Sequence, residues 1–245
     1  MNYGENIMKI VATCRTFNEH KHIEQWCKSY SEFADVLLVA DGGSEDNTVK
    51  IALEYPKVEV RNFSKVVTLK DGTLRNPDGE HVQFLVDWAT ELEGDWIVHQ
   101  DTDQRPNKFL KQDARKIMEG MEKDFLQVTQ IFLWGKDKYF HNLSFMGGQW
   151  AQGLWAWKLS TGLKIIDKMP HYMFSLDGQE PTDINKTGRE LNIQPPYCFM
   201  HYGWQTEQET QEHVDYYRRT GLINEMAHPL KFGGQPVPLL DWMVE

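Results

Sequence analysis

Two aspartates stand one residue apart in the segment WIVHQDTDQRP, residues 96–106, directly after a short apolar run. Asp101 and Asp103 offer carboxylate oxygens, which are the ligands that Mg²⁺ and Mn²⁺ prefer, usually one or two together with substrate phosphates. A divalent ion held there would neutralise the charge of a leaving diphosphate. The alternative is that both acids belong to an ordinary turn before a helix at 106–121.

A second buried-strand pattern, VLLVAD at 36–41, also ends on an acid. The carboxylate of Asp41 would accept hydrogen bonds from a base or a ribose, and Gly42 in the following GGS would let a ligand approach the backbone. The same residues also suit a plain turn in which Ser44 caps a helix at 45–55. The chain has neither a G-x-G-x-x-G fingerprint nor a G-x-x-x-x-G-K-[ST] loop, so we infer neither a dinucleotide site nor a P-loop.

Strand-like and helix-like segments alternate through the first half of the chain. The apolar patterns predict strands at 8–13, 36–41, 58–63 and 96–100, and helices at 18–33, 45–55, 80–93 and 106–121. Such alternation favours a parallel sheet with right-handed crossovers, whose ligands bind beyond the carboxyl ends of the strands. Asp41 and Asp101 would then lie at the same edge of that sheet.

The second half of the chain is less regular. Strands are expected at 125–134 and 154–159, a strand running into a loop at 197–204, loop-rich stretches at 135–153 and 160–195, and a helix at 206–221 closed by Gly221. The turn formers at 64–78 predict a hairpin or a loop, and the Gly- and Pro-containing tail cannot form a regular helix.

Composition excludes several classes of protein. The formal net charge is 26 − 36 = −10 over 245 residues, which argues against a nucleic-acid partner because phosphate backbones require clustered Lys and Arg. The three cysteines are widely spaced and form no CxxC pair, so we expect reduced thiols in a cytoplasmic protein. We expect no signal peptide and no membrane span, while peripheral membrane contact stays open.

Three segments together resemble the nucleotide-sugar half of family 2 glycosyltransferases with the GT-A fold. They are TCRTFNEHKHI, VLLVADGGSEDNT and GDWIVHQDTDQRP, which occur in the family's order within residues 8–110. They are similar to its Asn-Glu pair at the first helix, its Asp-Gly-Ser-x-Asp-x-Thr type of turn and its Asp-x-Asp segment. The resemblance implies an α/β, Rossmann-like, mostly parallel central sheet flanked by helices, with a smaller mixed or antiparallel acceptor-side portion.

The resemblance also implies roles for single residues. Contacts to a nucleotide sugar are implied for Arg15, Glu19, Asp41, Gly42, Arg75 and Asp101. Mn²⁺ or Mg²⁺ would bind at Asp101 and Asp103, with Asp103 the direct ligand. His201 in MHYGW would be a third metal contact or a phosphate contact, and the alternative is an ordinary histidine at a strand end. The LRN segment that contains Arg75 and Asn76 resembles an Arg-Asn element near the diphosphate, although Pro77 departs from the pattern.

The candidates for a catalytic base lie in the loop-rich half of the chain. Inverting members use a carboxylate to take the proton of the acceptor hydroxyl. Asp177, Glu180 and Asp183 in SLDGQEPTD are the candidates, and we expect Asp177, although each is equally compatible with a solvated loop acid. Tyr172 stands where some relatives carry the Glu of a His-Glu pair. The chain lacks the Gln-x-x-Arg-Trp signature of processive synthases, so one sugar per encounter is expected.

The sequence therefore predicts one GT-A domain and a metal-dependent, inverting glycosyltransferase. Residues 8–110 would bind a nucleoside-diphosphate sugar, 111–204 would form the acceptor side, and 205–245 would supply a helix and tail that brace the sheet, cover the site or pair subunits of a homo-oligomer. The acceptor would be a glycan, a lipid-linked molecule or a small molecule. Nine tryptophans suit either a Trp-rich core or stacking platforms, for which the candidates are Trp134, Trp150, Trp155 and Trp157.

Two rival functions remain. A nucleotidyltransferase acting on sugar phosphates also places acids at strand ends, but it usually carries a Gly-rich basic loop after its first strand, and ATCRTFNEHKH lacks one. A non-catalytic module of the same fold would bind nucleotide or sugar and would need no base.

Overall fold

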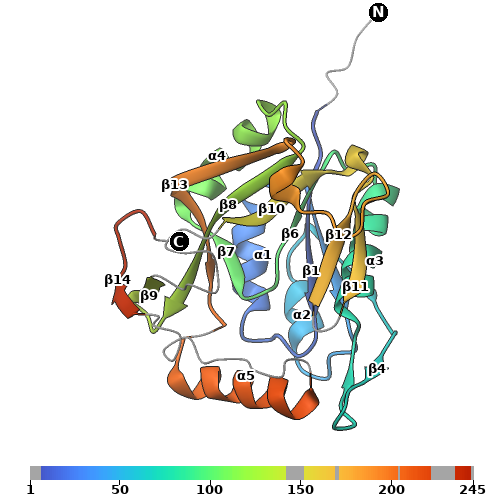
Figure 1. Cartoon of the computed structure of the whole chain (residues 1–245), viewed down its shortest axis with the longest axis vertical. Helices are drawn as coiled ribbons and strands as arrows, with labels where there is room; N and C mark the ends of the chain where they lie inside the picture. Colours follow the sequence, from blue (N-terminus) through green and yellow to red (C-terminus); the bar gives the residue numbers. More distant parts are fainter. Residues whose placement is uncertain (1–6, 142–151, 169–170, 204, 222–234, 244–245) are drawn as a thin grey trace, which may run out of the picture.

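The computed structural model describes residues 7–141, 152–168, 171–203, 205–221 and 235–243. A mixed sheet forms the middle of the molecule, and its first half consists of parallel strands in the order β3–β2–β1–β6 (Figure 1). These strands are β1 (Ile10–Thr16), β2 (Val36–Asp41), β3 (Val58–Asn62) and β6 (Trp96–His99). The predicted parallel half of the sheet is confirmed, with slightly shifted strand ends.

The second half of the sheet changes direction at β10. This strand pairs antiparallel with both β6 and β8, so β8 runs in the same direction as β6, and β13 pairs parallel with β8. β9 and β14 extend one edge as antiparallel strands, and β7 pairs antiparallel with β13. Their bounds are β7 (Gln104–Pro106), β8 (Phe125–Trp134), β9 (Lys138–His141), β10 (Gln152–Lys158), β13 (Glu190–His201) and β14 (Gln235–Pro238). This is the mixed portion that the sequence resemblance implied.

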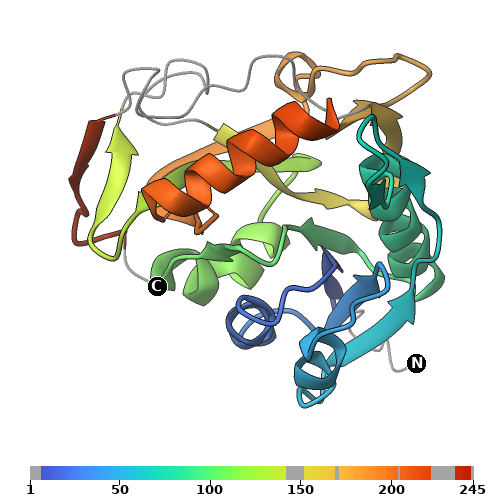
Figure 2. The ribbon, with the colours of Figure 1, turned by 90° about the horizontal axis from the view of Figure 1, so that it is seen from below.

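Helices cover both faces of the parallel half. Along β1 the side chains alternate, so Ile10, Ala12 and Cys14 share a core with α1 and α4, whereas Val11 packs in the core beneath α3. The helices are α1 (Ile23–Ser31), α2 (Thr48–Ala52), α3 (Asp78–Glu91), α4 (Lys108–Glu119) and α5 (Glu207–Thr220). The last of them, α5, runs along one end of the molecule, apart from the helices that cover the sheet faces (Figures 1 and 2).

Two helices begin later than the sequence predicted. Asn18 does not cap α1, because its φ of 58° places it in a turn, and the helix starts at Ile23. Ser44 does not cap α2, because its hydroxyl donates to Asp41, and this helix starts at Thr48. Both corrections lengthen the loops that follow β1 and β2, which are the loops expected to contact a ligand.

Two antiparallel hairpins lie beside the main sheet. They are β4 (Val67–Thr68) with β5 (Leu74–Arg75), and β11 (Lys164–Lys168) with β12 (His171–Ser175), the latter flanked by the short 3₁₀ helices η2 (Leu159–Thr161) and η3 (Ile184–Lys186). The first confirms the hairpin alternative for 64–78. The second corrects the prediction that 160–195 is mainly loop. β11 lies so close to α3 that a Cβ added to Gly79 would be 2.4 Å from the Cα of Asp167.

The tryptophans of β10 belong to the core. Trp155 and Trp157 are buried, so their predicted role as stacking surfaces is wrong and the Trp-rich core is correct for them. Trp134 is partly buried, with its ring centroid 5.1 Å from that of Phe140. Trp150 lies outside the described residues.

Cys14, Cys27 and Cys198 are free and buried. Within the described part of the chain, no helix combines the length and the apolar character needed to cross a bilayer.

Candidate active site

The two acidic strand ends lie at one edge of the sheet, on either side of β1. Thr16, the last residue of β1, pairs in register with Asp41 at the end of β2. On the other side β1 pairs with β6, and Asp101 follows β6 in the chain. Arg15 of β1 reaches across, and its Nε donates to Oδ1 of Asp101 over 2.9 Å. β1 therefore separates the two acids and supplies a side chain to each.

Asp41 organises the turn that follows its own strand. Its Oδ1 accepts from the hydroxyls of Thr16 (3.1 Å) and Ser44 (2.6 Å), and its Oδ2 accepts from the backbone N–H groups of Gly43 (3.1 Å) and Ser44 (2.9 Å). A carboxylate has about four acceptor sites, so the turn occupies all of them. A nucleotide base would have to replace one of these bonds to contact Asp41 directly.

The Arg-Asn segment lies over this turn. A Cβ added to Gly42 would be 2.0 Å from Oδ1 of Asn76, so only glycine fits beneath that side chain. Asn76 also donates to the carbonyl oxygens of Lys65 (2.8 Å) and Phe63 (3.3 Å). Gly42 and Asn76 thus form one wall of the site, and Pro77 does not disrupt it.

An ion-pair network that sequence reasoning missed is centred on Asp78. This buried carboxylate pairs with Arg15 through one oxygen and with Nη2 of Arg75 through the other, the latter over 2.6 Å. Arg15 in turn holds Asp101. Burial would raise the pKa of Asp101, but the charge and hydrogen bonds of Arg15 outweigh it and hold that pKa well below its usual value. The local signal at Asp78 is limited to its place at the start of α3, where an acid interacts well with the helix macrodipole.

Asp103 faces His201 rather than Arg15. The Nε2 of His201 is 3.7 Å from Oδ2 of Asp103, and the backbone N–H of Tyr202 donates to the carbonyl of Asp103 over 2.8 Å. Gly203 donates its N–H to Nδ1 of His201 over 3.2 Å, which leaves the proton of a neutral ring on Nε2. His201 is therefore presented as a hydrogen-bond donor toward the site.

Glu19 is the third acid of this region. Burial, together with the charge of Asp103, raises the pKa of Glu19 to about 7, while a hydrogen bond from Thr102 opposes that rise. Two neighbouring carboxylates disfavour each other's ionised forms, and a cation between them would relieve the repulsion. Glu19 and Asp103 therefore form an acidic pair suited to a positive ligand.

The donor set fits a divalent cation that is also bound by substrate. In the described ranges, no three His, Cys, Asp or Glu side chains gather into a complete metal site. Mg²⁺ is usually held by one or two carboxylates and completed by substrate phosphates. Asp103 with Glu19 fits that smaller set. Asp101 fits it less well, because both of its oxygens accept from Arg15.

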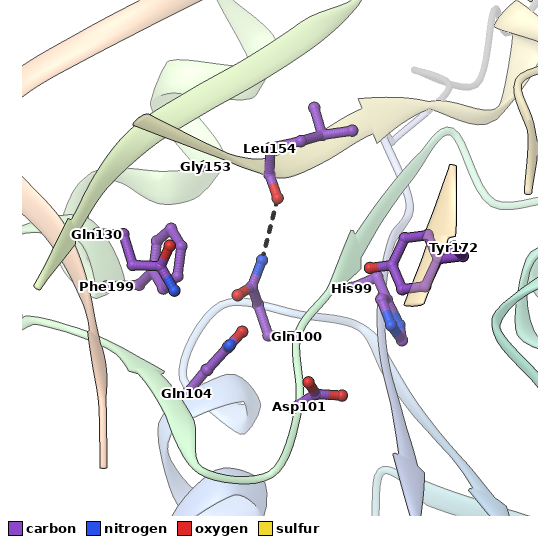
Figure 3. Close-up of a pocket in the computed structure, with 9 residues that line it drawn as sticks. All are labelled: His99, Gln100, Asp101, Gln104, Gln130, Gly153, Leu154, Tyr172 and Phe199. Carbon is purple, nitrogen blue, oxygen red and sulfur yellow. Dashed lines mark hydrogen bonds between the residues drawn. The ribbon is translucent and has the colours of Figure 1, made fainter. Parts of the chain in front are cut away.

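A pocket opens beside Asp101 on the side of β6 that faces β10 and β8 (Figure 3). It encloses about 170 Å³ and is lined by His99, Gln100, Asp101, Gln104, Gln130, Gly153, Leu154, Tyr172 and Phe199. The side chains of Gln100, Gln104 and Gln130 converge on the same space. A Cβ added to Gly153 would be 2.8 Å from the Phe199 ring, so glycine there leaves room for that ring.

Two titratable side chains of the pocket are held uncharged. Burial lowers the pKa of His99 to about 4, and its Nδ1 is 2.9 Å from the Thr13 hydroxyl. Burial, with the charge of Asp101, raises the pKa of Tyr172 above its usual value. Asp101 is therefore the charged member of the lining. Neither His99 nor Tyr172 was predicted as a site residue.

Helix α5 contributes two further side chains that the sequence analysis missed. Burial lowers the pKa of His213, while the charge of Asp103 acts in the opposite direction. Burial raises the pKa of Tyr217, with smaller influences from Arg75 and Asp78. A spacing of four residues places both on one helix face, which was the available sequence signal. α5 thus turns this face toward the ionic groups of the site.

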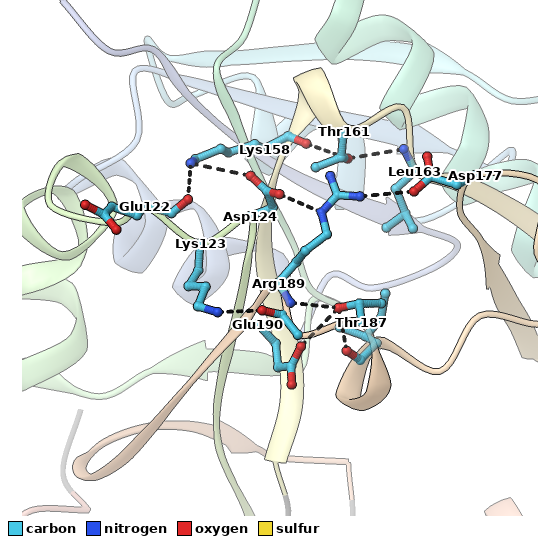
Figure 4. A network of polar contacts seen from close by, with 12 residues as sticks. Glu122, Lys123, Asp124, Lys158, Thr161, Leu163, Asp177, Thr187, Arg189 and Glu190 are labelled. Atoms are coloured by element: carbon cyan, nitrogen blue, oxygen red, sulfur yellow. Dashed lines mark hydrogen bonds and ion pairs between the residues drawn. The ribbon is translucent and has the colours of Figure 1, made fainter.

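The structure does not bring Asp177 to this site. Its carboxylate is 3.2 Å from Nη1 of Arg189, whose Nε donates to Asp124 over 2.7 Å (Figure 4). Asp124 immediately precedes β8, at the end of the sheet opposite to the carboxyl ends of the parallel strands. The other two loop acids, Glu180 and Asp183, are exposed on the same segment. The geometry therefore argues against Asp177 as the base, and pairing with Arg189 explains its position.

Comparison with known sequences gives distant relatives. No protein-family profile matches the chain. Uncharacterized proteins of Mycobacterium bovis and Mycobacterium tuberculosis are each 24% identical over 224 residues, which is 86% of this chain. The chain spans about half the length of these curated relatives, 50% in each case.

Comparison with solved structures is more informative about the fold. TarS of S. aureus (residues 1–349) in complex with UDP-GlcNAc matches 86% of this chain and 64% of its own, with a TM-score of 0.55 and 15% identity. Glucosyl-3-phosphoglycerate synthase from M. tuberculosis, crystallised with Mn²⁺, UDP and glucosyl-3-phosphoglycerate, matches 95% of this chain and 87% of its own, with a TM-score of 0.52 and 14% identity. Both are GT-A glycosyltransferases. The chain has the GT-A fold that the sequence resemblance implied.

Proposed function

We propose that the chain is a glycosyltransferase that moves a sugar from a nucleoside-diphosphate donor to an acceptor hydroxyl with the help of Mn²⁺ or Mg²⁺. The observation that carries the proposal is the convergence of Arg15, Asp101, Asp103 and His201 at the carboxyl edge of the parallel strands. Such edges are where α/β sheets bind their ligands. A pocket adjoins these residues on one side and the Asp41 turn adjoins them on the other.

The nucleotide would lie against the Asp41 turn. Gly42 leaves room for the side chain of Asn76, which lies over the turn. Arg75 would contact the diphosphate, because its Nη1 is buried and has no hydrogen-bond partner among the described residues. His201 would donate from Nε2 to a phosphate oxygen, which suits its proton position better than binding a metal ion does.

Asp103, with Glu19 beside it, would hold the cation. When bound, the ion would neutralise the diphosphate as its bond to the sugar breaks. Asp101 would act as a fixed carboxylate, oriented by Arg15, that accepts hydrogen bonds from the ribose or the sugar. This division gives the two aspartates of the Asp-x-Asp segment different tasks.

The solved structures with the same fold support this reading. TarS binds UDP-GlcNAc, and the mycobacterial synthase binds Mn²⁺ and UDP. UDP is therefore the first nucleotide to test. The pocket combines residues of both predicted halves, since Asp101 and Gln104 come from 8–110 and Gln130 and Tyr172 come from 111–204. Donor and acceptor would meet at this junction.

Stereochemistry remains a prediction. Inversion requires a base, and Asp101 is the carboxylate among the nine pocket residues. Its strongly lowered pKa makes it a weak base, because efficient general bases have a pKa near the working pH. Proton NMR of the first-formed product anomer would distinguish inversion from retention.

A thermal-shift screen tests the proposal directly. UDP-, GDP-, dTDP- and CMP-linked sugars would be added with and without Mn²⁺. A ligand at a hundredfold excess over its Kd stabilises the folded state by about 2.7 kcal/mol. We expect one donor to raise Tm only when Mn²⁺ is present, and we expect Asp103→Asn to abolish that rise. Asp177→Asn is the matched control, because this carboxylate pairs with Arg189 away from the site.

The same experiment separates the rival functions. A nucleotidyltransferase would respond to a nucleoside triphosphate with a sugar phosphate and would release pyrophosphate. A binding module would show the Mn²⁺-dependent shift but would never hydrolyse or transfer the donor sugar. No Mn²⁺-dependent shift with any donor would contradict the proposed function.

A further inference from the structure

The pocket beside Asp101 lies on the opposite side of that residue from the Asp41 turn. The strand order β2–β1–β6–β10–β8 places Asp41 on one flank of β6 and the pocket on the other. A nucleoside diphosphate could extend from the Asp41 turn across Asp101. The pocket would then hold either the sugar attached to the diphosphate or the acceptor that attacks that sugar. The polarity, charge and size of the pocket should then match the group that binds in it.

Three of the six polar side chains that line the pocket are amides. Gln100 donates from Nε2 to the carbonyl of Leu154 over 3.2 Å, which fixes its side chain and leaves Oε1 to accept from a ligand (Figure 3). Gln104 and Gln130 are partly exposed and point into the same space. A primary amide both donates and accepts hydrogen bonds, as a sugar hydroxyl does. Three converging amides therefore match a ligand that carries several hydroxyl groups.

The charge of the lining disfavours an ionic ligand. None of the nine lining residues is Lys or Arg, and Asp101 is already paired with Arg15. A carboxylate or phosphate in the pocket would meet the negative charge of Asp101 without a cation in the lining to offset it.

The volume and the rings limit the size of the ligand. About 170 Å³ is less than the roughly 300–1,000 Å³ of sites that enclose drug-sized molecules. Tyr172 and Phe199 provide flat apolar surface of the kind on which the C–H face of a sugar can pack. One ring fits this description better than an extended oligosaccharide does.

We propose that this amide-lined pocket binds one uncharged sugar ring and that Gln100, Gln104 and Gln130 select its pattern of hydroxyl groups. The inference rests on the proposed function and specifies its substrate class. The ring belongs either to the donor, as the group being transferred, or to the acceptor. The chemistry is the same in both cases, and binding measurements distinguish the two sources.

The first experiment measures the Kd of UDP and of UDP-glucose by calorimetry in the presence of Mn²⁺. Gln104→Leu and Gln130→Leu remove one amide each, and Gln194→Leu is the matched control because that glutamine is exposed on β13 outside the pocket. If the ring is that of the donor, each pocket variant should weaken the binding of UDP-glucose by roughly three- to tenfold, the size of one lost hydrogen bond, while the Kd of UDP stays the same. The control should change neither value.

The second experiment titrates methyl glucoside into protein saturated with UDP and Mn²⁺. If the pocket variants weaken methyl glucoside and leave UDP-glucose unchanged, the ring is that of the acceptor. If they weaken UDP-glucose, the ring is that of the donor. UDP-glucuronic acid is titrated beside UDP-glucose, and methyl glucuronide is titrated beside methyl glucoside. In the titration that responds to the pocket variants, we expect the added carboxylate to weaken binding at least tenfold. Either pattern supports a neutral ring in this pocket.

Two results would overturn the inference while leaving the proposed function intact. One is that UDP binds with Mn²⁺ but the pocket variants alter neither titration. The other is that the glucuronic acid compound binds as tightly as its neutral counterpart in the series that responds. Absence of Mn²⁺-dependent UDP binding would contradict the proposed function itself, and the inference with it.

Discussion

Arg15 donates to both carboxylate oxygens of Asp101, from Nε over 2.9 Å and from Nη2 over 3.4 Å. Asp103, two residues further along, has no part in this pair and faces His201 instead. A carboxylate bound by a guanidinium through both oxygens is fixed in orientation and is less available to a metal ion. The two acids of one short motif should therefore respond differently to substitution.

We expect Asp103→Asn to remove the Mn²⁺ dependence of UDP binding and Asp101→Asn to retain it. The first change neutralises the carboxylate that faces the acidic Glu19 and the open site, whereas the second removes an ion pair with Arg15. The measurement is the shift of Tm by UDP with and without Mn²⁺. Equal loss of the Mn²⁺ effect in both variants would show that the aspartates share the cation.

We expect Gly203→Ala to damage the site more than the fold. The new Cβ would lie 2.4 Å from Oδ2 of Asp103 and 2.8 Å from Cε1 of His201, so both side chains would have to move. The Kd of UDP with Mn²⁺ should rise at least tenfold, about 1.4 kcal/mol. Gly120→Ala is the control, because its Cβ would meet nothing closer than 3.4 Å. An unchanged Kd for Gly203→Ala would mean that His201 and Asp103 need not keep this arrangement.

We expect Arg15→Met to destabilise the protein as well as the site. Asp78 is almost fully buried, and removing Arg15 leaves it with Arg75 as its remaining ionic partner. Breaking a buried pair by deleting one partner costs about 3 kcal/mol or more, since the other charge stays out of water. Urea denaturation followed by circular dichroism measures this. Arg218→Met, which breaks an exposed pair with Asp215, should change stability by less than about 1 kcal/mol.

Stability should fall as the pH drops from about 6.5 to about 4, in part because of His81. Burial lowers the pKa of His81 to about 4, and the ring donates to the carbonyl of Ala40 while it stacks on Phe63. Below pH 6.5 the unfolded chain takes up a proton that the folded chain refuses until about pH 4, so acid favours unfolding. The full shift corresponds to about 3 kcal/mol.

His81→Gln keeps a hydrogen-bond donor but cannot titrate. The variant should lose less stability than the wild-type protein between pH 6.5 and pH 4, as measured by urea midpoints across that range. A wild-type slope that persists unchanged in His81→Gln would assign the pH dependence to other groups, such as His99.

The parallel half of the fold was predictable because its signals are local. Strands β1, β2 and β6 contain short apolar runs, and the acids at or just after the ends of β2 and β6 share an edge by topology alone. Strands β11 and β12 were missed because KIIDK and HYMFS are short and show no strict alternation of polar and apolar residues. They gain their place from packing on α3, where Gly79 allows contact with Asp167. That contact joins segments that are far apart in the sequence.

The site residues also divide into those with a local sequence signal and those placed by contacts between distant segments. Asp41, Asp101 and Asp103 follow strands and carry a recognisable spacing, whereas Asp78 gains its importance from Arg15, which lies far from it in the chain. Asp177 was selected for its residue type in a loop, but its position is set by Arg189 and by a turn in which its own φ is 52°. Neither pairing is visible in local sequence.

The four hydrogen bonds that converge on Asp41 have a consequence for the thermodynamics of recognition. A turn already locked by two hydroxyls and two backbone N–H groups has little freedom left to lose when a molecule docks on it. The turn loses its conformational entropy when the chain folds and not when the ligand binds. The loop after β2 would therefore be pre-organised for its ligand. Binding there would not require a slow step in which the loop becomes ordered.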